Sequence, residues 1–155
     1  MNIGFFDSGL GGLTILRAVV DALPEYNYEY YGDTANLPYG DKTENEVYEF
    51  SKQAVDCLFA RDCALIIIAC NTASAETLRR LQNEYLPTHY PQRKILGVII
   101  PTIETVIEHA RQSVLLIATK RTIESRKYER GLIQHGGANL LLESIATPEL
   151  VPLIE

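Results

Sequence analysis

The strongest constraint on the fold is a run without polar side chains, Ala64 to Cys70, which ends at a cysteine and is followed by Asn71 and Thr72. Such a run is typical of a strand buried on both faces of a parallel sheet. The next segment, Ala73–Tyr85, has helical spacing with Leu78 and Leu81 facing inward. The sequence therefore predicts a strand followed by a helix, with Cys70 at or just before the N-terminus of the helix.

Cys70 is the expected centre of a functional site. Open α/β sheets bind ligands at the carboxyl ends of their strands, and a helix N-terminus favours a thiolate. We therefore expect the pKa of Cys70 to lie below the usual value of about 8.5. The alternative is a buried cysteine that packs as a small hydrophobic residue. Asn71 and Thr72 favour a functional role, because polar side chains directly after a buried strand usually cap a helix or bind a ligand.

Two common cysteine motifs are excluded by spacing. A thioredoxin-like pair would need a second cysteine where Ala73 stands. A phosphatase-type loop would need an arginine where Glu76 stands, and a carboxylate there would repel a phosphate. The ligand expected near Cys70 is therefore not a phosphoryl group.

Composition narrows the class of partner. The 155 residues are 46% hydrophobic, enough for one good core. Lys and Arg number 14 against 20 Asp and Glu, and they form no basic stripe, which argues against nucleic acid. No apolar run approaches the length of about 20 residues that spans a bilayer, so no membrane partner is expected. The start of the sequence does not resemble a signal peptide, which fits a cytoplasmic protein. The three cysteines, Cys57, Cys63 and Cys70, fit a reducing compartment, and because they lack metal-ligand spacing no metal is expected.

The pattern of elements predicts an α/β fold with a parallel sheet flanked by helices, of flavodoxin-like type. Further strands are expected at Ile3–Phe6, Tyr28–Tyr31, Leu96–Ile100, Ser113–Ala118 and Leu140–Leu142, and further helices over residues 13–23, 44–61, 101–110 and 119–134.

Polar residues follow each of the first five strands. Besides Cys70 and its two successors, they are Asp7, Ser8, Asp33, Thr34, Tyr39, Thr102, Thr119 and Thr122. Because the carboxyl ends of parallel strands lie on one edge, these residues are expected to form a pocket for a small polar ligand. A carboxylate at the end of a strand, such as Asp7, is as typical of a residue that caps the following helix as of a residue in a ligand pocket. The glycine-rich turn after it is no dinucleotide fingerprint, because Thr14 stands where the last glycine would be.

Three motifs resemble the glutamate racemase family in their order and spacing. They are Phe6–Gly12, Gly32–Thr34 with Pro38–Gly40, and Ala69–Ser74. The related aspartate racemases usually have a histidine where Ser74 stands, so glutamate is the better supported substrate. The resemblance implies a cofactor-independent enzyme that makes D-glutamate for peptidoglycan. It also implies two similar α/β domains, of which residues 1–97 would be the first, carrying Cys70, and residues 98–155 part of the second.

The resemblance also implies roles for individual residues. Cys70 would be one of two cysteines that exchange the α-proton, assisted by Asp7. Asp7, Ser8, Tyr39, Gly40, Asn71 and Thr72 would hold the substrate, together with Thr119 and Thr122 from the second domain.

The family's second motif, Gly-Cys-Thr-His, does not occur in these 155 residues, and we expect a racemase cut short before it. Thr88-His89-Tyr90-Pro91 is only a chance likeness to its tail, and Glu155 is expected to match the acid on the far side of the substrate. The alternative function is a non-catalytic, amino-acid-binding or regulatory remnant. Uncovered apolar faces could lead such a chain to form a homo-oligomer.

Overall fold

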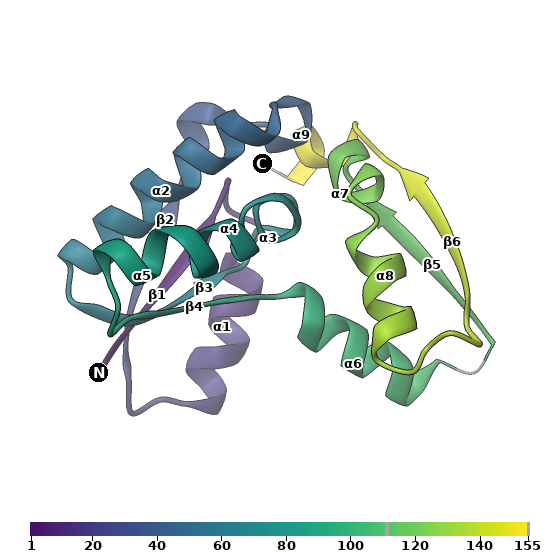
Figure 1. Ribbon diagram of the computed structural model, residues 1–155, viewed down its shortest axis with the longest axis horizontal. Helices are drawn as coiled ribbons and strands as arrows, with labels where there is room; N and C mark the ends of the chain where they lie inside the picture. Colours follow the sequence, from purple (N-terminus) through teal and green to yellow (C-terminus); the bar gives the residue numbers. More distant parts are fainter. Residues whose placement is uncertain (111, 155) are drawn as a thin grey trace.

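The computed structural model, which describes residues 1–110 and 112–154, contains two parallel sheets that a helix connects (Figure 1). The strands are β1 (Asn2–Asp7), β2 (Asn27–Gly32), β3 (Cys63–Ile68), β4 (Lys94–Gly97), β5 (Ser113–Ala118) and β6 (Leu141–Ala146). The α-helices are α1 (Leu13–Ala22), α2 (Glu44–Ala60), α3 (Asn71–Glu76), α4 (Leu78–Arg80), α5 (Leu86–His89), α6 (Ile99–His109), α7 (Lys120–Glu124), α8 (Lys127–Gln134) and α9 (Leu150–Ile154). The 3-10 turns η1 (Thr34–Asn36) and η2 (Tyr39–Asp41) and the π-helical turn η3 (Leu81–Tyr85) complete the described elements. The predicted α/β architecture is confirmed.

The first sheet has the strand order β2-β1-β3-β4 and carries helices on both faces. Successive side chains of a strand alternate between the two faces of a sheet. On β1, Ile3 and Phe5 pack with residues of α1, while Phe6 packs with residues of α2. All three are buried. The apolar strands predicted from the sequence therefore lie in the middle of the sheet, with a helical layer on each side.

The order of the strands reverses between β1 and β3. The chain moves outward to β2 after β1, and to β4 on the opposite side after β3. A reversal of this kind leaves a crevice at the carboxyl ends of the two central strands. The paired strands keep those ends in step, since the N–H of Ala69 donates to the carbonyl oxygen of Phe6 at 2.8 Å. Asp7 and Cys70 therefore follow neighbouring strands at the same edge.

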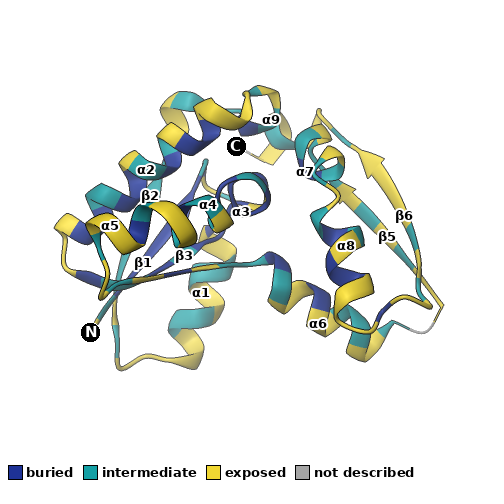
Figure 2. Cartoon of the chain, in the orientation of Figure 1, coloured by how far each residue is buried: buried dark blue, intermediate teal, exposed yellow. Residues whose placement is uncertain are grey.

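The second sheet consists of β5 and β6, and its two faces differ in burial. One face packs on α6 and α8, where Ile103 and Leu132 are buried. The other face is apolar yet exposed, as the yellow bands on these strands show (Figure 2). Its members are Leu115, Ile117, Leu141 and Ile145, each at least half exposed.

The predicted strand Leu96–Ile100 is wrong in its position. The strand ends at Gly97, and α6 begins at Ile99. A short apolar run does not distinguish a buried strand from the first turn of a buried helix, and Ile99 packs in the core beside α6 and α8. Thr102 consequently lies inside the helix, where its hydroxyl donates to the carbonyl oxygen of Val98 at 2.7 Å. The expectation that five strand ends share one edge is also wrong, because β5 belongs to the second sheet.

The two long helices predicted over residues 73–85 and 119–134 are each interrupted. A π-helical turn, η3, precedes Pro87, whose missing N–H and bulky ring disturb regular helical hydrogen bonding. Helix α7 ends before Arg126, which has a left-handed backbone with φ of 53°. Ser125 stabilises this break, since its hydroxyl donates to the carbonyl oxygen of Thr122 at 2.6 Å. Neither break has a glycine that would reveal it in the sequence.

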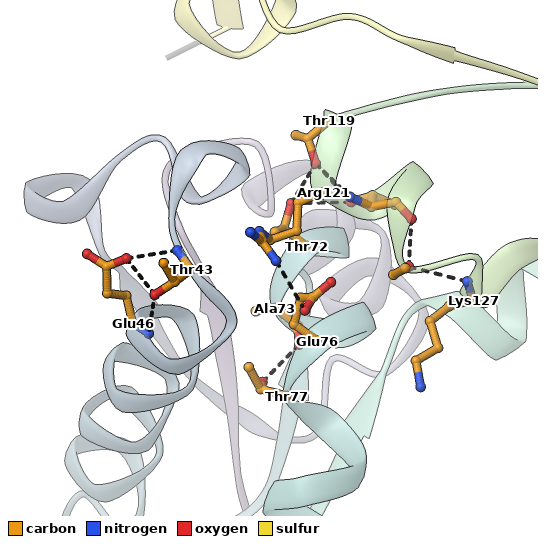
Figure 3. Close-up of polar contacts among 11 residues, drawn as sticks. Thr43, Glu46, Thr72, Ala73, Glu76, Thr77, Thr119, Arg121 and Lys127 are labelled. Atoms are coloured by element: carbon orange, nitrogen blue, oxygen red, sulfur yellow. Dashed lines mark hydrogen bonds and ion pairs between the residues drawn. The ribbon is translucent and has the colours of Figure 1, made fainter.

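The start of α2 generates a prediction about stability. The Thr43 hydroxyl oxygen accepts from the N–H of Glu46 at 3.3 Å, and the Glu46 carboxylate accepts from the N–H of Thr43 at 2.8 Å (Figure 3). We expect Thr43→Ala to lower the free energy of unfolding by about 1 kcal/mol, because this capping box is lost. Urea unfolding measures the change. Thr105→Ala, an exposed position inside α6, is the control, and an equal loss in both variants would contradict the prediction.

Candidate active site

Cys70 occupies the position that the sequence predicts, after β3 and directly before α3. It is the N-cap residue of α3, and its Sγ accepts from the N–H of Ala73 at 3.4 Å. The thiol also donates to the Ser8 hydroxyl oxygen at 3.4 Å. Ser8 follows β1, so the two central strands of the first sheet together position this thiol. Only 6% of Cys70 is exposed.

The electrostatic environment overturns the expected lowering of the Cys70 pKa. Burial raises the pKa of the Cys70 thiol, and the negative charge of Asp7 raises it further. Hydrogen bonds to Ser8 and from the N–H of Ala73 act in the opposite direction, but burial is the largest effect. Helix α3 has only six residues, and Cys70 itself is buried at its N-terminus. These surroundings therefore favour the protonated thiol over the thiolate.

Asp7 organises the glycine-rich turn and also supplies charge beside the thiol. Its Oδ2 accepts from the N–H groups of Gly9 at 3.2 Å and Gly12 at 3.0 Å. A Cβ atom at Gly12 would lie 2.8 Å from the Asp7 Cβ atom, so only glycine allows this close approach. Asp7 therefore fixes the turn that precedes α1, whereas the first turn of that helix has no side-chain cap. The capping alternative is wrong in this form, and the turn places a buried carboxylate next to Cys70.

Three hydroxyl groups connect the first sheet to the second. Thr72 Oγ1 lies 3.0 Å from Thr119 Oγ1 (Figure 3). Thr122 Oγ1 lies 3.3 Å from Thr72 Oγ1 and 3.0 Å from Thr119 Oγ1. Thr72 belongs to α3, whereas Thr119 is the N-cap residue of α7 and follows β5. The structure thus brings these three sequence-predicted residues together across 47 to 50 positions of the chain.

A cavity of about 310 Å³ lies beside Cys70. This volume suits a small ligand. Six of the sequence-predicted residues line it, namely Asp7, Ser8, Cys70, Asn71, Thr72 and Thr119. Val151 and Ile154 add an apolar wall at the α9 side, and Glu155 lies outside the described residues.

Asp33 and Thr34, which were also expected in this pocket, do not line the cavity. Three residues that the family resemblance places at the substrate also lie elsewhere. Tyr39 is 2% exposed, and its hydroxyl donates to the Asp33 carboxylate at 2.6 Å. Gly40 packs against Thr119, where an added Cβ would lie 3.0 Å from the threonine Cβ. Thr122 lines a larger, mostly apolar cavity of about 580 Å³ that β5, α6 and α8 border. Roles for these residues in ligand binding stay predictions.

The sequence reasoning missed two contacts that join the halves of the site. Arg121 of α7 forms an ion pair with Glu76 of α3 at 3.6 Å (Figure 3). Burial raises the pKa of Glu76, and the Arg121 charge opposes that rise. Tyr128 of α8 donates from its hydroxyl to Asn71 Oδ1 at 2.6 Å. Glu76 lies one helical turn after Thr72, which is the one sequence signal that it shares a face with the site.

Among residues 1–110 and 112–154, no group of three His, Cys, Asp or Glu side chains is placed to hold a metal ion. Within the same ranges, the helices are too short or too polar to cross a membrane.

Comparisons with known proteins agree with the motifs. A glutamate racemase from Ruegeria pomeroyi is 43% identical, in a match that covers 85% of this chain and 52% of the relative. The structure of a glutamate racemase isoform from Bacillus anthracis superposes with a TM-score of 0.88 at 33% identity, covering 98% of this chain and 55% of that one. The structure of a glutamate racemase from Francisella tularensis in complex with D-glutamate superposes with a TM-score of 0.79 at 30% identity, covering 99% and 55%.

The predicted similarity to glutamate racemases is thereby confirmed. No protein-family model matches the chain. The chain spans about half the length of the curated relatives it matches.

The environment of Cys70 generates a prediction about its reactivity. We expect iodoacetamide labelling of Cys70 to have a pH midpoint above about 8.5, because burial and Asp7 disfavour the thiolate. The measurement uses a chain in which Cys57→Ser and Cys63→Ser leave one thiol. Asp7→Asn should lower the midpoint, since it removes the neighbouring negative charge, with circular dichroism as the check on folding. A midpoint below 8.5 in the parent would contradict the assigned environment.

Proposed function

We propose that this chain carries one side of a glutamate racemase active site, in which Cys70 is a thiol acid/base that exchanges the α-proton of glutamate. The proposal rests on one observation in a chain that is similar to glutamate racemases. The buried Cys70 thiol lies beside a carboxylate and lines a small cavity with polar residues. The proposed domain boundary follows Gly97, between the first sheet and α6. Residues 1–97 would supply Cys70 and residues 98–155 the threonines of α7.

The chemistry of this exchange fits the residues around the cavity. In this proposal the Asp7 carboxylate, which shares the cavity with Cys70, takes the proton of the thiol. The bond between the α-carbon and its proton then breaks, that proton passes to the Cys70 thiolate, and the electron pair moves into the substrate carboxylate. Charge that develops on the carboxylate needs hydrogen-bond donors that are already in place. Ser8, Asn71 and Thr72 line the cavity and carry such donors.

The raised pKa of Cys70 has two consequences for this reaction. The raised pKa disfavours the thiolate, but a thiolate that forms is a stronger base than one of ordinary pKa, which favours removal of a weakly acidic α-proton. The protonated thiol is in turn the group that returns a proton to the same face. The opposite face would need the second cysteine that the family resemblance implies.

The proposal also covers the cofactor requirement, the compartment and the use of the product. The reaction would run without a cofactor, in the cytoplasm, and supply D-glutamate for peptidoglycan. The D-glutamate complex of the Francisella tularensis racemase supports glutamate as the ligand. A glutamate-binding chain without turnover is the second candidate, because Cys57 and Cys63 are not among the residues that line the Cys70 cavity.

Hydrogen exchange at the α-carbon separates the two candidates. The chain is incubated with L- or D-glutamate in deuterated water, and the α-proton signal is followed by NMR. We expect deuterium to enter one enantiomer with retention, at a rate that Cys70→Ala abolishes and Cys57→Ala leaves unchanged. Binding without exchange would favour the second candidate. Exchange that persists in Cys70→Ala would exclude Cys70 as the base.

A further inference from the structure

The contact between Tyr128 and Asn71 joins the second sheet to the residue that follows Cys70. The Tyr128 hydroxyl donates to Asn71 Oδ1 at 2.6 Å, across 57 positions of the chain. Tyr128 is 9% exposed and packs in the core that Ile103 and Leu132 form beside α6 and α8. Its ring is therefore held firmly, whereas Asn71 is exposed and has no comparable packing of its own.

This contact decides how the Asn71 amide is oriented. An asparagine amide presents an oxygen that accepts hydrogen bonds and an NH₂ group that donates two. Burial raises the pKa of Tyr128, so its hydroxyl remains a neutral donor at physiological pH. With the amide oxygen held by this donor, the NH₂ group is directed away from the tyrosine. Asn71 lines the Cys70 cavity, where a carboxylate ligand would need such donors.

We propose that Tyr128 is a positioning residue, which fixes the Asn71 amide so that its N–H donors serve a carboxylate of the ligand beside Cys70. The inference rests on the proposed function and adds a residue to it. It also gives the second sheet a role in ligand binding beyond the threonines of α7. Cys70 and Asn71 follow a strand of the first sheet, whereas the hydroxyl that holds the Asn71 amide comes from α8 beside the second sheet.

Substitution of the tyrosine hydroxyl tests the inference. We expect Tyr128→Phe to weaken glutamate binding about tenfold, roughly the effect of losing one hydrogen bond, in a calorimetric or NMR titration. Tyr90→Phe is the matched control, because it also removes a phenol hydroxyl, one that donates to Asp56 at 2.9 Å and does not line the cavity. Equal affinities of the parent and Tyr128→Phe would overturn the inference.

A double-mutant cycle separates positioning from general support of the fold. If Tyr128 acts through Asn71, Tyr128→Phe should cause no further loss in a chain that already carries Asn71→Ala. Additive losses would mean that the tyrosine acts elsewhere and would overturn the inference. Asn71→Asp keeps the acceptor for Tyr128 but removes both N–H donors, so we expect it to weaken binding at least as much as Tyr128→Phe.

A measurement without ligand keeps this inference separable from the proposed function. The side-chain NH₂ signals of Asn71 in a ¹⁵N-labelled chain should shift in Tyr128→Phe and stay unchanged in Tyr90→Phe. Unchanged signals in Tyr128→Phe would overturn the inference. Failure of the parent chain to bind glutamate would instead overturn the proposed function, while shifted signals would still support Tyr128 as the residue that orients Asn71.

Discussion

The parallel pairing of β1 with β3 is the constraint on which the site depends. Backbone hydrogen bonds between these strands hold their carboxyl ends in step, so Asp7, Ser8 and Cys70 meet at one point of the sheet. Glycine at position 12 lets the turn after β1 close on Asp7 without a side chain in the way. The chain order reverses at this pair, which is why the crevice opens here and not at β2 or β4.

The two halves meet through polar groups at the site. Three threonine hydroxyls, the Glu76–Arg121 ion pair and the bond from Tyr128 to Asn71 all join α3 to α7 or α8. Hydrogen bonds of this kind each contribute about 1 kcal/mol, far less than a buried apolar core. Ala75 of α3 adds an apolar contact to this junction, since it is buried in the same cluster as Ile103 and Leu132.

The surroundings of Cys70 favour the neutral thiol, whereas a helix N-terminus alone would favour the thiolate. Withdrawal from water and the Asp7 charge both disfavour the thiolate, and the hydrogen bonds at Cys70 do not offset them. A neutral, buried thiol is protected from chance oxidation and alkylation, because the thiolate is the reactive form. The same surroundings make the thiolate a stronger base once it forms, which is what α-proton removal demands.

The local pattern of apolar and polar residues in the sequence determined the positions of several strands. The apolar run before Cys70 predicted β3, and Ser113–Ala118 was predicted with its exact bounds, because burial and side-chain alternation are properties of short segments. The motifs around Asp7, Asp33 and Cys70 indicated the family resemblance. Only the tertiary structure decided that β5 starts a separate sheet, that α6 begins at Ile99 and that the pKa of Cys70 is raised. Those features, like the contact of Tyr128 with Asn71, depend on groups distant in the chain, since desolvation and hydrogen bonding are set by what surrounds a side chain in space.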